Sequence, residues 1–440
     1  MKIYFDTLGC PKNFYDTDAA KYLLKEKGQI ITDDPEDADV IIVNTCGFID
    51  DAKRESIERI LEFADAKEDR QKLVVSGCLP KRFSRELKEE MPEVDMFIGV
   101  NEYGRLPELL MDFPGSKVDV TETYDSFLPF LKRDLGDHPY SATLKIAEGC
   151  NNRCAYCAIP GIRGNYRSKR KEDVLEEARY LASSGVKELI LIAEDTTNYG
   201  TDIYDSYRLA DLLRELVKVG GIEWIRLMYC YEDRITDDLI SVMSSEPKIC
   251  HYIDVPIQHS SDKVLKEMRR RSTGASIRET LGKLRAAMPD ICIRTTLIVG
   301  FPGETEEDFR DLMELVREEK FQRLGVFSYS REEGTPAGDR EDQVPEDVKQ
   351  ERLDLIMMTQ MEISKSHNEA LKGRTLKVMV DASEEDGSYV GRTMYDAPEI
   401  DDSVIFTSGK ELRPGDIVSV TIEDAFDYDL TGFETEGQEI

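Results

Sequence analysis

Six short apolar runs recur at long spacing between residues 140 and 340, and they constrain the fold more than any other feature of this 440-residue chain. Patterns typical of helices separate them, for example over residues 172–184 and 304–319. Strands that alternate with helices form parallel sheets. Six such repeats predict a partial β/α barrel. The runs cover residues 142–147, 189–193, 224–229, 252–256, 292–299 and 324–329.

The same alternation predicts an N-terminal domain with a parallel α/β sheet over residues 1–112. Its expected strands cover residues 2–6, 40–44, 73–76 and 96–98, and its expected helices cover residues 16–27, 51–64 and 81–90. Residues 113–139 contain several Pro and Gly residues with little periodicity, which predicts a linker. The central domain, with a trailing helix over 345–371, is then expected to span 140–371.

The C-terminal residues 372–440 change character. Short β-rich runs over 376–380, 389–392, 403–406 and 417–422 are interrupted by Gly, Asp and Pro. This pattern predicts a small all-β barrel of about the size of an oligonucleotide-binding fold.

Three cysteines lie close together directly after the first apolar run of the central domain. Cys150, Cys154 and Cys157 form the pattern C-x-x-x-C-x-x-C, and we call them the loop triad. Soft thiolates on a tight loop suit an iron–sulfur cluster. Zinc is the alternative, but a structural zinc site usually has four protein ligands. Three protein ligands would leave one iron of a four-iron cluster open to a small molecule.

Three other cysteines are far apart in the sequence but share one position. Cys10, Cys46 and Cys78 each follow the end of a predicted strand, and we call them the dispersed triad. Ligands of open α/β sheets gather at such ends, so these thiols are expected to meet. Gly9 and Gly77 would allow close backbone approach. Buried structural thiols are the alternative, but three equivalent positions favour a second cluster. The cysteines without a motif, predicted to be structural, are Cys230, Cys250 and Cys292.

Polar and glycine residues follow several predicted strands of the central domain. Residues 194–197 follow the second strand, 258–260 the fourth, and 300–304 the fifth. Function in β/α barrels lies at the carboxyl ends of the strands. A tight turn with a helix cap is an alternative for 300–304, but the shared position favours a binding site.

Acidic residues outnumber basic ones by 89 to 58, so the net charge is −31. Nucleic-acid binders usually carry a basic footprint, because Lys and Arg neutralise phosphates. A basic partner is favoured instead. No stretch approaches the about 18 apolar residues of a membrane span, and no signal-peptide pattern begins the sequence. We therefore expect a cytoplasmic protein with reduced cysteines.

The spacing of the loop triad resembles the signature of radical S-adenosylmethionine (SAM) enzymes, whose open iron binds SAM. Together with the dispersed triad and the C-terminal barrel, this motif makes the chain resemble the radical SAM methylthiotransferases over nearly its whole length. In that family the C-terminal barrel is called the TRAM domain. Residues 7–13, 195–200 and 391–399 resemble the branch that modifies an aspartate in the twelfth protein of the small ribosomal subunit. The branch that modifies transfer RNA typically has Gln-Met-Asn where this chain has Pro11, Lys12 and Asn13.

The resemblance implies two 4Fe-4S clusters, one on each triad. The first would cleave SAM to a radical that abstracts hydrogen from the aspartate β-carbon, and the second would deliver the methylthio group. The resemblance also implies a sulfur donor, an electron donor and a basic ribosomal protein as substrate. The acidic charge predicts that direct nucleic-acid binding is at most secondary. The expected SAM contacts are Tyr156, Glu194, Gln258 and Gly300, although Glu194 stands where relatives are expected to have Gln.

Two alternatives stay open. Modification of transfer RNA would need a basic surface, but residues 372–440 contain 17 acidic and six basic residues. Basic clusters from Arg167 to Lys171 and from Arg269 to Arg271 could touch RNA, although a solvated surface is the expected role. A non-catalytic iron–sulfur or zinc protein, used for electron transfer or scaffolding, would show no SAM turnover.

Overall fold

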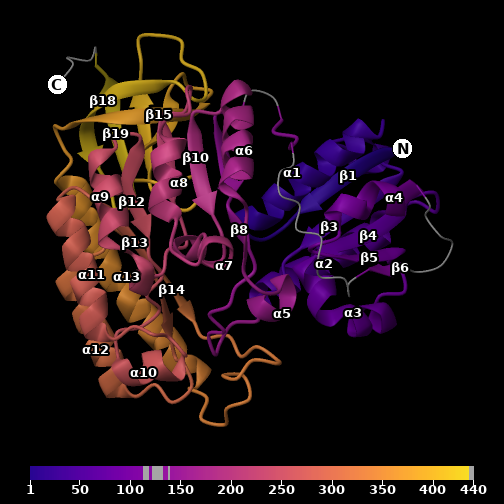
Figure 1. Ribbon diagram of the computed structural model, residues 1–440, viewed down its shortest axis with the longest axis horizontal. Coiled ribbons are helices and arrows are strands. Elements are labelled where there is room, and N and C mark those ends of the chain that lie inside the picture. The colour runs from indigo at the N-terminus through magenta and orange to yellow at the C-terminus, as the bar shows by residue number, and fades with distance from the viewer. Residues whose placement is uncertain (112–117, 121–131, 137–138, 436–440) are drawn as a thin grey trace. The chain divides into compact units, whose positions relative to one another are not determined.

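The computed structural model describes residues 1–111, 118–120, 132–136 and 139–435 (Figure 1). The chain forms two compact units. Unit 1 comprises residues 1–136, 145–177 and 330–339, and unit 2 comprises residues 137–144, 178–329 and 340–440. Residues 145–177, which the sequence placed in the central domain, therefore pack with the N-terminal residues. Within the described residues, no helix is long and apolar enough to cross a membrane.

Unit 1 contains a six-stranded sheet in the order β2-β1-β3-β4-β5-β6, with neighbouring strands parallel. The strands are β1 (Lys2–Thr7), β2 (Ile30–Ile31), β3 (Val40–Thr45), β4 (Lys72–Gly77), β5 (Met96–Gly99) and β6 (Val118–Val120). Four of them match predicted strands, whereas β2 was missed and β6 lies in the predicted linker. The strand order reverses between β1 and β3, and such switch points are where open α/β sheets bind ligands.

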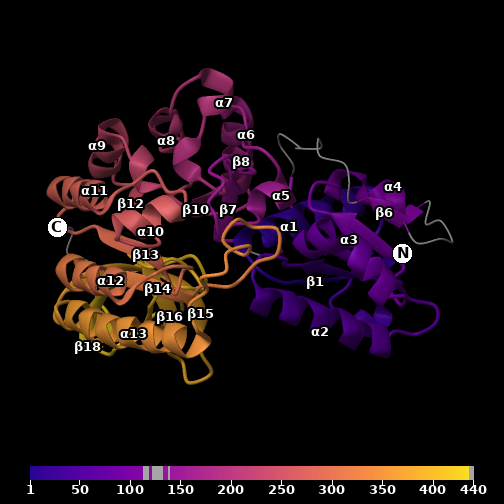
Figure 2. The same cartoon turned by 90° about the horizontal axis from the view of Figure 1, so that it is seen from below.

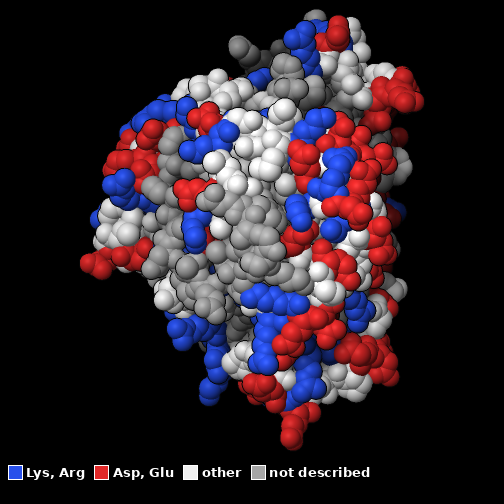
Figure 3. All heavy atoms as spheres, turned by 90° about the vertical axis from the view of Figure 1, so that its right-hand side faces the viewer, with Lys and Arg blue, Asp and Glu red and all other residues white. Residues whose placement is uncertain are grey.

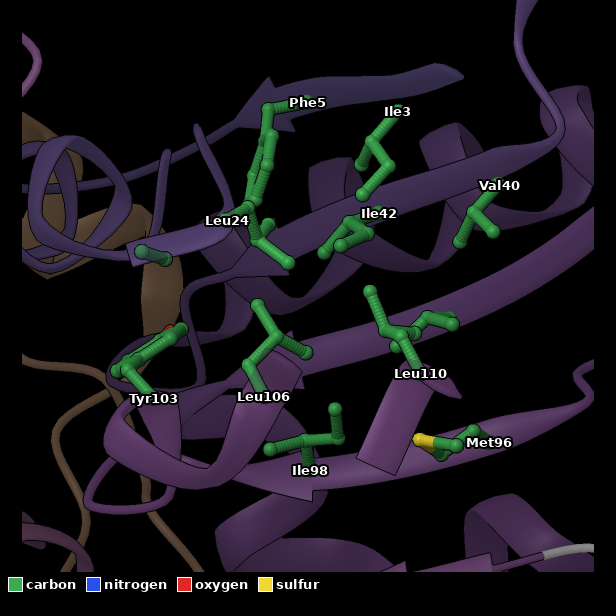
Figure 4. Close-up of a cluster of buried hydrophobic side chains, with 12 residues drawn as sticks. Ile3, Phe5, Leu24, Val40, Ile42, Met96, Ile98, Tyr103, Leu106 and Leu110 are labelled. Atoms are coloured by element: carbon green, nitrogen blue, oxygen red, sulfur yellow. The ribbon is translucent and has the colours of Figure 1, made fainter. Parts of the chain in front are cut away.

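Helices cover both faces of this sheet, as a buried parallel sheet requires. They are α1 (Pro11–Glu26), α2 (Asp50–Ala66), α3 (Cys78–Glu90) and α4 (Leu106–Met111), with short turns at Pro35–Asp37 and Tyr103–Arg105. Because strand side chains alternate between faces, Ile42 packs with Leu24 of α1 and Leu106 of α4 (Figure 4). The next residue along β3, Val43, packs on the opposite face with Ile60 of α2.

Unit 1 also holds a small two-stranded sheet and a short helix that flank the loop triad. They are β8 (Ala147–Glu148), which pairs antiparallel with β9 (Arg167–Ser168), and α5 (Ile159–Arg163).

The central sheet has the order β14-β13-β12-β11-β10-β7, so all six apolar runs form strands. The pairs from β10 to β14 are parallel. The strands are β7 (Ser141–Lys145), β10 (Glu188–Ile192), β11 (Trp224–Leu227), β12 (Ile249–Asp254), β13 (Cys292–Val299) and β14 (Arg323–Ser328). This architecture confirms the predicted six-repeat fold.

Helices follow the strands of the central sheet, and α12 contacts the long helix α13 (Figure 2). The helices are α6 (Lys171–Ser183), α7 (Thr201–Tyr204), α8 (Leu209–Leu216), α9 (Asp237–Ser245), α10 (Asp262–Glu267), α11 (Gly274–Ala287), α12 (Glu306–Glu319) and α13 (Glu346–Glu369), with short turns at Thr196–Asn198 and Glu232–Arg234. A capping box of Thr305 and Asp308 begins α12.

The C-terminal strands close into a barrel in the order β15-β16-β17-β19-β18. They are β15 (Thr375–Ser383), β16 (Tyr389–Thr393), β17 (Ser403–Thr407), β18 (Ile417–Ala425) and β19 (Asp429–Glu434). The predicted small barrel is confirmed. The sequence missed β19, which closes the barrel by pairing with β17 and β18.

Candidate functional site

The dispersed triad lies at the switch point of the sheet in unit 1. Each cysteine of this triad follows the end of a strand. Cys46 directly follows β3, and Cys78 directly follows β4 and begins α3. Cys10 comes after the short turn that follows β1. A Cβ added at Gly9 would lie 2.8 Å from the Cβ of Cys46, and one at Gly47 would lie 2.9 Å from the carbonyl carbon of Cys78. The three loops therefore pack so closely that glycine is needed beside the thiols.

The local electrostatics act on these thiols in two ways. Cys10 occupies the N-cap position of α1 and Cys78 is the first residue of α3, and the partial positive charge of a helix N-terminus favours a bound anionic group. Burial raises the pKa of the Cys46 thiol, and neighbouring Cys10 adds to that shift. An added positive group at this point would oppose the effect of burial on Cys46.

Asn13, in the first turn of α1, ties the strand ends together. Its Nδ2 donates to the carbonyl oxygens of Leu8 at 2.9 Å and Thr45 at 3.1 Å. Its own carbonyl oxygen accepts from Nδ2 of Asn44 at 3.0 Å. Its Oδ1 accepts from Nη2 of Arg163 at 2.8 Å. The loops that carry the dispersed triad are therefore held by a connected set of hydrogen bonds.

The loop triad is also in unit 1, on a loop shaped by backbone hydrogen bonds. The N–H of Cys150 donates to the carbonyl oxygen of Gly164 at 3.1 Å, and the N–H of Cys157 donates to that of Cys154 at 3.1 Å. The N–H of Asn152 lies 3.5 Å from Sγ of Cys150 and donates to it. The Asn152 N–H, which donates to sulfur, stabilises negative charge on Cys150.

Residues 330–339 pack onto both parts of unit 1. The N–H of Ala337 donates to the carbonyl oxygen of Ala155, between two cysteines of the loop triad, at 2.9 Å. The buried carboxylate of Glu332 accepts from Lys53 of α2 at 2.9 Å and from Arg82 of α3 at 2.7 Å. We call residues 330–339 the bridging loop.

The donor sets of the two triads fit iron–sulfur clusters. Each offers three cysteines, whose thiolates are soft ligands, and the tight glycines beside the dispersed triad leave little room there for other side chains. Among the residues that the structure describes, no group of three or more His, Cys, Asp or Glu side chains is arranged so that it could hold a single metal ion.

The residues expected to contact SAM lie in both units. Tyr156 is half-buried within the cysteine loop of unit 1. In unit 2, Glu194 follows β10, Gln258 follows β12 and Gly300 follows β13. Nε2 of Gln258 donates to the carbonyl oxygen of Pro256 at 3.4 Å, so this side chain contacts its own loop.

Gly300 occupies a position that admits no side chain. Its φ is +73°, and an added Cβ would lie 2.3 Å from Cγ of Lys349. Its N–H donates to Oε2 of Glu304 at 2.8 Å, and that carboxylate also accepts from Arg352 at 2.8 Å. Burial raises the pKa of Glu304 to about 7, against the lowering effect of Arg352. The turn after β13 is therefore rigidly supported.

The structure corrects the expectation of a solvated surface for two basic residues. Lys169 is buried, with Nζ 2.6 Å from Oε2 of Glu177. Arg270 is buried as well, with Nη2 2.8 Å from Oε2 of Glu232. Charged residues are buried in this way when carboxylates pair with them. On the face drawn in Figure 3, basic and acidic side chains are interspersed.

A buried ion network beside the dispersed triad was missed by sequence reasoning. Lys145 and Arg163 pair with Asp16 and Glu148, and all four side chains are at least nine-tenths buried. Against the effect of burial, Lys145 and Arg163 hold the pKa of Glu148 below its ordinary range. The available signal was a charge, Lys145, inside an otherwise apolar run.

Comparisons with known proteins first define the class. The Radical SAM superfamily matches residues 144–316, the TRAM domain matches residues 373–433, and a family described as uncharacterized protein family UPF0004 matches residues 2–99. Together with the parallel sheet and the closed barrel, these matches make the chain a radical SAM enzyme with a TRAM domain.

Solved structures of low sequence identity share this fold. The radical SAM methyltransferase TsrM from Kitasatospora setae matches with a TM-score of 0.57 and 16% identity, over 77% of this chain and 75% of that chain. The cobalamin-dependent SAM radical enzyme OxsB matches with a TM-score of 0.53 and 12% identity, over 82% of this chain and 57% of that chain.

Relatives of high identity define the family. A protein from Clostridioides difficile (strain 630) is 46% identical over 98% of both chains, and one from Pelobacter propionicus is 48% identical over 98% of this chain and 97% of its own. Both are named ribosomal protein uS12 methylthiotransferase RimO. This chain belongs to that family of radical SAM methylthiotransferases, which confirms the resemblance stated above.

Proposed function

We propose that this enzyme attaches a methylthio group to the β-carbon of an aspartate in ribosomal protein uS12. The observation that carries the proposal is the match to relatives named for uS12 modification, which are 46–48% identical over nearly the full length. The two cysteine triads add the donor sets that such a reaction needs.

The loop triad would hold a 4Fe-4S cluster that binds SAM, and the dispersed triad would hold a second 4Fe-4S cluster. These groups supply radical chemistry for a C–H bond that acid–base catalysis does not activate. The protein contributes the thiolates, holds their loops by hydrogen bonds and buries Cys150 and Cys154 from water. We assign SAM contacts to Tyr156, Glu194, Gln258 and Gly300. A sulfur donor and an electron donor complete the requirements.

The charge distribution supports a protein substrate over transfer RNA. Residues 372–440 carry 17 acidic and six basic residues, and an acidic surface complements a basic ribosomal protein. Lys169 and Arg270, which belong to the two basic clusters, are buried in ion pairs and are not offered to phosphates. Action on a ribosomal protein would take place in the cytoplasm.

Mass spectrometry of uS12 and of transfer RNA from a deletion strain tests the proposal. We expect uS12 to lose the mass of one methylthio group on an aspartate and to regain it when this chain is restored. Loss of a methylthio group from transfer RNA, with uS12 unchanged, would contradict the proposed substrate. Restoration with a Cys150→Ala variant is the matched control, because it removes only one thiolate.

A further inference from the structure

The Arg163 guanidinium connects the segment after the loop triad to the dispersed triad. Arg163 is the last residue of α5, six positions after Cys157. Its Nη2 lies 3.9 Å from Sγ of Cys78, within hydrogen-bond distance for sulfur, and also donates to Oδ1 of Asn13 at 2.8 Å. Its Nη1 donates to Glu148 at 2.8 Å and to Asp16 at 3.2 Å. These contacts all lie within unit 1.

Apolar packing fixes α5 in this place. Ile162 and Cys78 belong to one buried cluster with Val100, and Ala158 packs against it. Arg163 itself is 1% exposed. Both the backbone that carries the guanidinium and the thiol that it faces are therefore held in position.

The charges around Arg163 balance. Two cations, Lys145 and Arg163, face two carboxylates, Asp16 and Glu148, at distances of 2.5–3.2 Å. The carboxylates offset the positive charge at long range, but the Arg163 guanidinium lies 3.9 Å from Sγ of Cys78, so its own charge acts on that thiol directly. What remains directed at Cys78 is a charge-assisted N–H donor, and such donors are stronger than neutral ones.

We propose that Arg163 is a positioning residue for the second cluster, which donates an N–H···S hydrogen bond to the Cys78 thiolate and raises the reduction potential there. The inference rests on the proposed function, since it requires a cluster on the dispersed triad. Hydrogen bonds to ligand sulfurs and net charge are known to set the potentials of iron–sulfur clusters. Reduction adds negative charge, so a donor stabilises the reduced form more than the oxidised form.

The test uses the full chain with Cys150, Cys154 and Cys157 all replaced by Ala, so that iron can bind only at the dispersed triad. The protein is reconstituted without oxygen from ferrous iron and sulfide, and a redox titration is followed by electron paramagnetic resonance. Arg163→Gln should raise the ratio of oxidised to reduced cluster about tenfold at a fixed potential, which is about 59 mV for one electron. Arg323→Gln is the matched control, because Arg323 is buried and paired with Asp396 in unit 2.

A second measurement avoids any loss of folding in the variant. The triple-Ala protein with Arg163 intact is labelled with 15N-arginine. Electron–nuclear double resonance should then detect 15N coupled to the reduced cluster. Arg163→Lys should remove this coupling while keeping the positive charge. Equal potentials for the protein with Arg163 intact and for the Arg163→Gln variant, or no 15N coupling, overturn the inference alone. Failure of the triple-Ala protein to bind iron overturns the second cluster, and with it the inference.

Discussion

Glu188 in β10 and Arg392 in barrel strand β16 form a fully buried ion pair, with Oε2 2.5 Å from Nη2. The other carboxylate oxygen of Glu188 lies 2.9 Å from Nε of Arg226 in β11. Ser141 donates to Oε2 at 2.8 Å. The carboxylate of Glu188 therefore connects the barrel with two strands of the central sheet of unit 2.

Replacing this carboxylate should destabilise unit 2. Glu188→Gln removes the carboxylate that Arg226 and Arg392 share and leaves Arg392 with its longer pair to Asp381 at 3.3 Å, which costs about 3 kcal/mol. Urea unfolding at pH 7 measures this loss, and Glu385→Gln is the control because that side chain is exposed. Equal unfolding free energies for the two variants would contradict the role of Glu188.

The same pair predicts a pH dependence. Against the effect of burial, Arg392 and Arg226 lower the pKa of Glu188 from 4.5 to about 2. Because the pKa is lower in the folded state, ionisation stabilises the fold above about pH 4.5, and this stabilisation is lost as the pH falls toward 2. The difference in unfolding free energy between wild type and Glu188→Gln should therefore shrink between about pH 5 and about pH 2, as measured by urea titration.

Replacing a cysteine of each triad in turn should separate radical formation from transfer of the methylthio group. Cys150→Ala should abolish formation of deoxyadenosine from SAM, because the proposed SAM-binding cluster would lose a ligand. Cys46→Ala should still form deoxyadenosine but give no methylthiolated uS12. Chromatography and mass spectrometry measure both products. Cys250→Ala is the control, since burial raises the pKa of that thiol to about 11 and makes it unreactive. Full product from Cys46→Ala would rule out the second cluster.

The sequence predicted the repeating elements well because their apolar periodicity is local. All six runs of the central domain became strands, and the four predicted barrel strands formed. It missed β19, whose residues Asp429 to Glu434 include few apolar side chains. Closure of the barrel depends on pairing between segments that are distant in sequence, which local patterns do not encode.

The same limit applies to charged residues. Lys169 and Arg270 were expected at the surface because charge is normally solvated, yet each is buried with a carboxylate. Their partners, Glu177 and Glu232, come from other elements of the fold. The contact of Arg163 with Cys78 likewise joins residues 85 positions apart. Such pairings follow from the assembled fold.

Removing the anion of the bridging loop should loosen that loop. Glu332→Gln breaks ion pairs with Lys53 and Arg82, whose side chains are 14% and 9% exposed, at a cost of about 3 kcal/mol. Amide hydrogen exchange over residues 330–339 should accelerate. Glu333→Gln is the control, because Glu333 is the next residue in the sequence and its side chain is exposed. Unchanged exchange in Glu332→Gln would show that backbone contacts alone hold the loop.

A side chain at Gly300 should weaken SAM binding. Gly300→Ala places a Cβ 2.3 Å from Lys349 and must displace the turn after β13. We expect at least a tenfold rise in the dissociation constant for SAM, measured by calorimetry on the reconstituted enzyme. Gly334→Ala is a matched control, since Gly334 has the same φ of +73° but nothing within 4 Å of the added atom. Equal affinities for the two variants would exclude Gly300 from the SAM site.

The discontinuity of unit 1 has a consequence for how the enzyme is made. Its last piece is the bridging loop, whose Glu332 and Ala337 contact α2, α3 and the loop triad. A nascent chain lacks these contacts until most of its length has left the ribosome. Insertion of a cofactor that needs the completed unit would therefore come late in biosynthesis, and a chain that stops before residue 330 carries both cysteine triads in an unfinished unit.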